Sequence, residues 1–216
     1  MTHTLFIALD GPKGVGKTTL LEAVAHALRR NGHTVVRLSE RNNDPDRAQT
    51  MALVNAYARH PQVELERRIC ARLADSRAWI TTQVLPRQPA GSLILMDRWY
   101  ASDAAFRRGV PFEEVLRLNR EREVRMPDLQ VGVVTAPEVS WARAAARRSG
   151  LRSTVLQTFD DHVACTEAFE RAMIDQGWVV CRNDGTLADA TTQVVAAIEQ
   201  VVHCRRRPAD GRCGVS

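Results

Sequence analysis

The sequence predicts an α/β fold, a three-layer sandwich in which a five-stranded parallel sheet lies between two layers of helices. Two observations lead to this prediction. Short apolar runs alternate with segments of helical periodicity along the chain, an alternation typical of a parallel sheet with helices on both faces. A glycine-rich loop also joins the first apolar run directly to the first helical segment, which is the arrangement of a phosphate-binding loop.

Five segments are predicted to be strands, because each is short, rich in apolar or β-branched residues and bounded by polar or turn-forming residues. They cover residues 5–10, 33–39, 92–96, 128–135 and 178–181. The run at 92–96 is apolar at every position but its first serine, as a central parallel strand should be.

The first two helices are expected on either side of the second strand. The first follows the glycine-rich loop and stops at Asn31-Gly32, and its apolar positions at helical spacing are Leu20, Leu21, Val24, Ala25 and Leu28. Residues 40–45 have the polar composition of a loop, and a short helix is expected at 46–60.

Proline and glycine mark the ends of the remaining helices. Pro61 precedes a long helix that Pro86 ends, with one face formed by Leu65, Ile69, Leu73, Ile80 and Val84. Further helices are expected at 111–124, from 137 to a break at Gly150, and at 153–175. Thr186 with Asp189 resembles a capping box that begins the last helix.

Composition indicates one domain of ordinary soluble type. The chain has 216 residues, of which 44% are hydrophobic and 25% are charged. No apolar run approaches the roughly 18 to 20 residues of a membrane helix, and no targeting segment is recognisable, so we expect a cytoplasmic protein without a membrane partner. Its five cysteines are widely spaced and form no metal-binding pattern, so we expect reduced thiols.

The formal charge of +5 is concentrated in two short segments. Residues 141–152 hold four arginines and no acid, and residues 204–216 hold four arginines and one acid, so the rest of the chain is slightly negative. We therefore expect no nucleic-acid partner for the domain, which should span residues 1–203. The tail at 204–216 is expected to be mobile, and non-specific contact with polyanions through it stays open as an alternative.

The glycine-rich loop fits the spacing G-x-x-x-x-G-K-[ST] of a P-loop and predicts a P-loop NTPase fold. In such a loop, backbone N–H groups surround a β-phosphate, Lys17 reaches the β- and γ-phosphates, and the Thr18 hydroxyl is placed for Mg²⁺. The cofactors are therefore expected to be ATP and Mg²⁺. The predicted ATP-binding residues of the loop are Gly11, Pro12, Lys13, Gly14, Val15, Gly16, Lys17, Thr18 and Thr19.

Other polar residues also follow strands, and ligands of open parallel sheets bind at the carboxyl ends of the strands. Glu40-Arg41 follows the second predicted strand, Asp97-Arg98-Trp99 the third, and the polar loop 182–186 the fifth. Together with the P-loop, Ser102, Phe106 and the basic segment after the fourth strand, this order resembles the thymidylate kinase family. The resemblance covers about residues 5–202.

The resemblance implies roles for individual residues on the acceptor side. Arg98 would grip the acceptor phosphate with its guanidinium fork, and Asp97 would lie beside Mg²⁺ and the phosphates. Ser102 and Phe106 would border the acceptor, where Phe106 could also be an ordinary core residue. Glu40 would accept the proton of an attacking hydroxyl, as in related deoxynucleoside kinases, or could be a solvated loop charge.

The resemblance also implies roles on the donor side. A lid at about 141–155 would close over the donor phosphates with Arg143, Arg147 and Arg152, although a solvated helix face would show the same arginines. Asn183 and Gly185 would border the adenine. The family further implies a homodimer.

The chain departs from the family on the acceptor side. Lys13 occupies a P-loop position where the family usually has a carboxylate, and the usual Pro-Gly-Gly is absent after Glu40. Arg107 replaces a glutamine that commonly follows the acceptor-facing aromatic residue. In the long helix, Arg72 and Arg77 are candidates to bind the acceptor, in uncertain register.

These observations predict an ATP-dependent phosphotransferase whose acceptor is a nucleotide or nucleoside, with dTMP or a related pyrimidine nucleotide as first choice. Positioning and charge neutralisation dominate phosphoryl transfer, and the residues above supply both. One alternative is a kinase for the hydroxyl of a nucleoside or small metabolite, with Glu40 as its base. Another is a regulatory protein that binds ATP as a switch, although Arg98 and the lid arginines would then be unnecessary.

Overall fold

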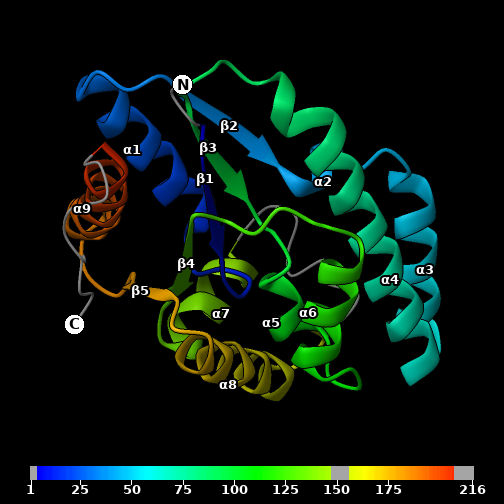
Figure 1. Ribbon diagram of the computed structural model, residues 1–216. Coiled ribbons are helices and arrows are strands. Elements are labelled where there is room, and N and C mark those ends of the chain that lie inside the picture. Colours follow the sequence, from blue (N-terminus) through cyan, green and yellow to red (C-terminus); the bar gives the residue numbers. More distant parts are fainter. Residues whose placement is uncertain (1–3, 147–155, 207–216) are drawn as a thin grey trace.

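The computed structural model describes residues 4–146 and 156–206, which form a five-stranded parallel sheet with helices on both faces (Figure 1). The strands are β1 (Leu5–Asp10), β2 (Val35–Ser39), β3 (Leu93–Asp97), β4 (Leu129–Val134) and β5 (Val179–Arg182). Their spatial order is β2-β3-β1-β4-β5, and every neighbouring pair is parallel. The predicted α/β fold and its five strands are confirmed, with strand ends within two residues of those expected.

Helices fill the intervals between the strands. They are α1 (Lys17–Arg30), α2 (Glu40–Asn43), α3 (Arg47–Arg59), α4 (Val63–Trp79), α5 (Ser102–Phe106), α6 (Phe112–Glu121), α7 (Pro137–Ala145), α8 (Phe159–Asp175) and α9 (Leu187–Arg206). In Figure 1, α1 and α9 lie together on one side of the sheet, and α3 lies outside α4.

Strand β1 lies in the middle of the sheet and sends alternate side chains to its two faces. Leu5, Ile7 and Leu9 belong to the core that α1 and α9 share, whereas Phe6 and Ala8 belong to the core beneath α5, α6 and α8. This alternation is the period of a strand, and it places the carboxyl end of β1 between two packed layers. The P-loop therefore begins at a rigid point of the fold.

Two short helices were not expected from the sequence. Residues 40–43 were predicted to belong to a loop, but they form the single helical turn α2 directly after β2. Helix α5 follows the turn after β3 and lies in a stretch for which no element was predicted. Neither has the length at which helical periodicity can be recognised, so their stability comes from tertiary contacts.

The long helix predicted from residue 63 to Pro86 changes its form before it ends. It is α-helical to Trp79, continues as a π-helical segment (Ile80–Val84) and closes with a 3₁₀ turn (Leu85–Arg87). Of its predicted apolar face, Ile69 and Ile80 are buried, but polar side chains such as Glu66 and Arg77 are buried as well. Apolar periodicity alone could not reveal this buried polar face.

Helix α8 begins later than predicted. Its expected start at residue 153 lies outside the described residues, but residues 156–158 are not helical, and a capping box of Thr158 and Asp161 begins the helix at Phe159. The predicted pairing of Thr186 with Asp189 at the start of α9 is confirmed.

Helix α9 runs on through Cys204 into the segment expected to be a tail, whose remaining residues 207–216 lie outside the description. In the described part of the chain, no helix is long and apolar enough to cross a membrane. Cys70, Cys165, Cys181 and Cys204 are free thiols, as expected, whereas Cys213 lies outside the described residues.

Candidate functional site

The P-loop connects β1 to α1 and needs glycine at two positions where its backbone is left-handed. Gly14 has φ 88° and Gly16 has φ 86°. A Cβ atom on Gly14 would lie 2.0 Å from the backbone oxygen of Ser140, so α7 packs directly on the loop. Glycine thus allows both the turn and the close approach of a second element.

This loop lines a pocket of about 260 Å³ at the carboxyl ends of β1, β2 and β3. Its walls are Pro12, Lys13, Gly14, Val15, Gly16, Lys17, Thr18, Ser39, Arg41, Asp97 and Arg98. Gly11 and Thr19, which were predicted with the ATP-binding residues, are not on the pocket wall. Four of the lining residues carry a positive charge and one carries a negative charge, so the pocket is suited to anions.

Lys17 lies at the start of α1 and is only 6% exposed. Its Nζ atom is 3.1 Å from Oδ1 of Asp97 at the end of β3. Burial, and then the positive charge of Arg98, lower the pKa of Lys17 to about 8, while Asp97 acts in the opposite direction. Asp97 at the end of β3 thus pairs with the lysine of the P-loop.

Arg98 adopts a backbone conformation that is rare for a residue with a side chain, with φ 69°. Two hydrogen bonds hold this turn: Arg98 N donates to Leu9 O over 3.1 Å, and Trp99 N donates to Oδ1 of Asp10 over 2.9 Å. Asp10 is fully buried beneath the P-loop, and this burial raises the pKa of its carboxyl group. Such a conformation costs on the order of 1–3 kcal/mol and is found mostly at functional sites.

The side chain of Arg98 is directed over the P-loop by two further partners. Its Nη1 atom donates to Gly11 O over 3.3 Å and to Ser102 Oγ over 3.1 Å, and its guanidinium lies 5.0 Å from the ring centre of Phe106. The structure therefore brings together Arg98, Ser102 and Phe106, which the sequence had placed on the acceptor side.

Glu40 is not a solvated loop charge, an alternative that its 7% exposure shows to be wrong. Its Oε1 atom accepts a hydrogen bond over 2.6 Å from Nε of Arg77, whose Nη1 atom lies 2.8 Å from the Asp103 carboxylate. Burial raises the pKa of Glu40, and the charge of Arg77 opposes this increase. None of these three residues lines the pocket at the P-loop.

Arg72 lies on the same helix as Arg77 and is also engaged. Its Nη2 atom is 2.8 Å from Asp44 and 3.4 Å from Asp46, and Asp44 also accepts a hydrogen bond from Thr50. Arg72 thus fastens the segment between α2 and α3 to α4. Binding of the acceptor by Arg72 or Arg77 stays a prediction.

Arg41 is a candidate site residue whose position after the second strand the sequence showed, but to which it assigned no role. It lines the pocket at the P-loop together with Arg98, and within residues 4–146 and 156–206 neither guanidinium is paired with a carboxylate. The sequence signal for Arg41 was its positive charge close behind the second predicted strand, at the end of the sheet where ligands bind. Arg41 and Arg98 thus differ from Arg72, Arg77 and Arg107, which all bind carboxylates.

The loop after β5 supports the P-loop from the other side. The buried Asn183 side chain donates from Nδ2 to Val15 O over 2.7 Å, and Arg143 Nη1 donates to Asn183 O over 3.4 Å. Gly185 lies farther along this loop and is exposed. The structure therefore places Asn183 and Arg143 beside the P-loop, and their contact with a nucleotide stays a prediction.

Helix α7 leads toward the predicted lid and is fastened to α8. Ser140 Oγ lies 2.6 Å from Nε2 of the buried His162, and Trp141 packs against the same ring. Burial lowers the pKa of His162, so the neutral imidazole is favoured. The two other predicted lid arginines, Arg147 and Arg152, lie outside the described residues.

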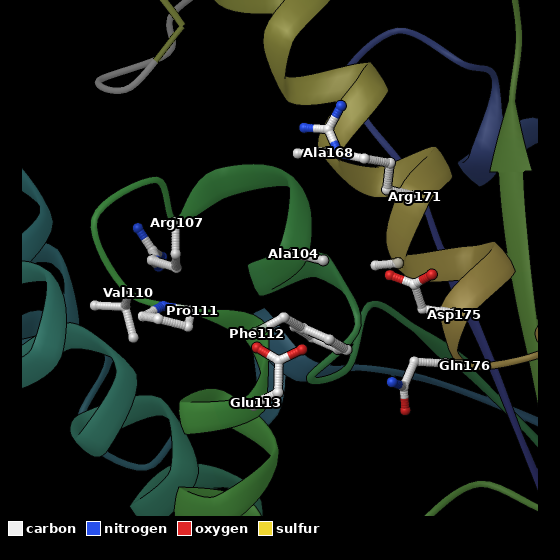
Figure 2. Close-up of a pocket in the computed structure, with 11 residues that line it drawn as sticks. Ala104, Arg107, Val110, Pro111, Phe112, Glu113, Ala168, Arg171, Asp175 and Gln176 are labelled. Atoms are coloured by element: carbon white, nitrogen blue, oxygen red, sulfur yellow. The ribbon is translucent and has the colours of Figure 1, made fainter.

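A second hollow, of about 250 Å³, lies away from the P-loop between α5, α6 and α8 (Figure 2). Arg171 and Asp175 of α8 stand on one side of it, and Phe112 and Glu113 at the start of α6 stand on another (Figure 2). Arg107, which also lines it, is 3.3 Å from Asp103. Among the residues that the structure describes, it shares none of its lining with the pocket at the P-loop.

Comparisons with known proteins agree with this geometry. A family model described as thymidylate kinase matches residues 9–195. A thymidylate kinase from Halalkalibacterium halodurans is 32% identical over 178 residues, which cover 79% of this chain and 83% of that protein. One from Shouchella clausii is 31% identical over 150 residues, covering 66% and 68%, and one from Bacillus licheniformis is 30% identical over 119 residues, covering 54% and 56%.

Proposed function

The chain belongs to the thymidylate kinase family, and from this premise we propose that it transfers the γ-phosphoryl group of ATP to dTMP or a related pyrimidine nucleoside monophosphate. The observation that carries the proposal is a pair of arginines, Arg41 and Arg98, which line the pocket at the P-loop and have no carboxylate partner among the described residues. Two guanidinium groups at this place suit an acceptor that carries its own phosphate.

The contacts of Glu40 support a phosphate acceptor over a hydroxyl acceptor. A hydroxyl must lose its proton to a base during transfer, whereas a phosphate is already ionised near pH 7. Glu40 is the base that the hydroxyl-kinase alternative requires, but its Oε1 atom is bonded to Arg77 and the residue does not line the pocket. These contacts support a structural role for the carboxylate.

On the donor side, the P-loop would bind the ATP phosphates through its backbone N–H groups and Lys17. The surroundings fit Mg²⁺, because Thr18 and Asp97 both line the pocket, Thr18 is exposed and 26% of the Asp97 side chain is accessible. Magnesium usually takes few protein ligands and completes its shell with water and phosphate oxygens. When bound, the ion would neutralise phosphate charge.

The residues of this chain would act mainly by position and charge. Arg41 and Arg98 would hold the acceptor phosphate, and Lys17 would neutralise charge that develops on the transferred group. Arg143 would approach from the side of α7, and Arg147 and Arg152 would act from the lid predicted at about 141–155. Phe106 would support Arg98 and border the acceptor sugar.

The assay that tests this function incubates the protein with ATP, Mg²⁺ and a panel of nucleosides and their monophosphates, and measures ADP release. Phosphorylation of dTMP, with no turnover of thymidine, is the expected result. Turnover of nucleosides alone would contradict it, and ATP binding without turnover of any acceptor would favour the regulatory alternative.

We also propose a cytoplasmic location and a homodimer. The four free cysteines of the described residues fit a reducing compartment, and ATP is abundant there. The dimer rests on the family resemblance. Its mass in solution can be measured by light scattering, and a monomer at the concentrations of the activity assay would contradict the dimer.

A further inference from the structure

Arg77 joins three segments that are separate in the sequence. It lies near the end of α4 with 1% of its surface exposed, binds Glu40 of α2 through Nε and binds Asp103 of α5 through Nη1. Asn119 of α6 lies 3.5 Å from the same guanidinium. One buried side chain thus connects the segments that follow β2 and β3.

Each of the two carboxylates is adjacent in the sequence to an arginine of the pocket or to a residue that binds one. Glu40 directly precedes Arg41 in α2. Asp103 directly follows Ser102, whose Oγ atom accepts a hydrogen bond from Arg98. The bridge through Arg77 therefore links the position of Arg41 to the position of Arg98.

We propose that Arg77 is a positioning residue, which sets the spacing of Arg41 and Arg98 and so determines how well the acceptor phosphate is bound. This inference rests on the proposed function, and it differs from the role that the family resemblance implies for Arg77, which is direct contact with the acceptor. Arg77 is buried and does not line the pocket at the P-loop.

The lengths of α2 and α5 make both helices dependent on tertiary contacts such as this bridge. They have four and five residues, and neither has a side-chain hydrogen bond at its N-cap. A helix of one turn is not stable by itself, because nucleation fixes several residues for the gain of one hydrogen bond. The guanidinium fork, which can bind two carboxylates at fixed angles, supplies the missing constraint.

The charges of this cluster are balanced within the protein. Arg107 lies 3.3 Å from the other oxygen of Asp103, so two arginines face two carboxylates. The cluster therefore needs no ligand to compensate its charge, in contrast to Arg41 and Arg98. This balance fits a fixed support better than a binding surface.

The test uses Glu40→Gln, Asp103→Asn and Arg77→Lys, which weaken the bridge while keeping similar shapes. The control is Asp75→Asn, because Asp75 lies on α4 but makes an exposed ion pair with Arg122. Displacement of a binding group by about 1 Å can cost about 10²-fold. We expect kcat/KM for the monophosphate to fall about 10- to 10²-fold in the three variants, with unchanged KM for ATP, and no change in the control.

Two comparisons separate positioning from direct contact. A positioning role predicts the same fold-loss for dTMP, dUMP and dCMP, because only the shared phosphate is affected, whereas a loss that varies with the base would overturn the proposal. Glu40→Gln should also add nothing to Arg41→Ala, and Asp103→Asn nothing to Arg98→Ala. Additive losses would overturn the proposal as well.

Folding and the proposed function are checked separately. Thermal unfolding shows which variants are folded, and the double variant Glu40→Gln/Arg77→Met removes the bridge while Asp103 keeps its pairing with Arg107. Failure of the wild type to phosphorylate any monophosphate would refute the proposed function alone. Binding of inorganic phosphate in the presence of ADP, measured by calorimetry, then tests the bridge: weaker binding in the variants supports it, and equal binding overturns it.

Discussion

The side-chain amide of Asn183 donates a hydrogen bond over 2.7 Å to the backbone oxygen of Val15, and so ties the loop after β5 to the P-loop. The two residues are 168 positions apart in the sequence. Asn183 also closes the space beside Gly16, where an added Cβ atom would lie 2.5 Å from its Nδ2 atom. The shape of the phosphate-binding loop thus depends on the last strand of the sheet.

Asn183→Ala should therefore weaken ATP binding and lower stability. The Val15 oxygen loses its partner in a buried place, a change that costs about 1–3 kcal/mol. We expect KM for ATP to rise about tenfold and the melting temperature to fall. Asn55→Ala, at an exposed position of α3, is the control and should change neither quantity. Unchanged ATP binding in Asn183→Ala would show that the loop keeps its shape without this bond.

Lys17→Ala should abolish activity and weaken ATP binding while the protein stays folded. The loop conformation is set by its backbone, whereas the ammonium group faces the pocket and Asp97. Circular dichroism checks the fold, and calorimetry measures ATP binding. Near-normal turnover of the variant would mean that the P-loop is not the donor site.

ATP binding should take up a proton above about pH 8. Burial, and then the charge of Arg98, lower the pKa of Lys17 to about 8, and the ATP phosphates favour its protonated form. Affinity for ATP should fall as the pH rises from about 8 toward 10. Calorimetry at pH 8.5 in two buffers of different ionisation enthalpy measures the uptake. It should disappear in Lys17→Met, and equal heats in both buffers for the wild type would contradict the prediction.

The same pKa has the opposite effect on the stability of the unliganded protein. An unfolded lysine holds its proton until about 10.5, whereas the folded protein releases it near pH 8. The unfolded state therefore binds more protons between these values, and the contribution of Lys17 to the free energy of unfolding increases with pH in that range.

Glu40→Gln and Arg98→Ala distinguish the two kinds of acceptor. Loss of a general base typically costs about 10²- to 10⁴-fold in rate, so a hydroxyl kinase should lose most of its kcat in Glu40→Gln. For a monophosphate kinase, we expect a moderate loss in kcat/KM with Glu40→Gln and a much larger one with Arg98→Ala. Steady-state kinetics at saturating ATP measure both. A kcat loss in Glu40→Gln larger than that in Arg98→Ala would favour the hydroxyl kinase.

The arginines of the predicted lid should act on the rate of transfer. We expect Arg147→Ala or Arg152→Ala to lower kcat by at least about 10²-fold with little change in the acceptor KM, toward the roughly 10³- to 10⁵-fold attributed to arginine fingers. Lys13, on the wall of the pocket, is the rival source of this charge. Normal turnover of both lid variants with loss of activity in Lys13→Ala would assign the role to the P-loop.

The sequence predicted the sheet and the P-loop because their signals are local. The apolar runs of β1 and β3 and the spacing of Gly11, Gly16 and Lys17 can each be recognised within a short window. The meeting of Arg98 with Ser102 and Phe106 was also anticipated, since the three lie within one turn and the short helix that follows it. The family resemblance supplied their order.

The remaining features depend on contacts between distant residues. Arg77 stands 37 positions from Glu40, and no periodicity indicates that a buried helix face would contain an arginine and a glutamate as well as apolar side chains. The short helices α2 and α5 owe their form to such contacts, so their sequences looked like loops. The bond from Asn183 to Val15 likewise joins residues 168 positions apart, so the sequence could not indicate it.

At position 98, the left-handed backbone favours glycine for stability, whereas the proposed phosphate binding requires the guanidinium of arginine. Glycine would adopt φ 69° without the steric cost of about 1–2 kcal/mol that a Cβ atom brings there, so it would make the folded protein more stable. It would also remove the guanidinium. A search for heat-resistant variants that ignored turnover should therefore select glycine at position 98, and a stabilised but inactive protein would result.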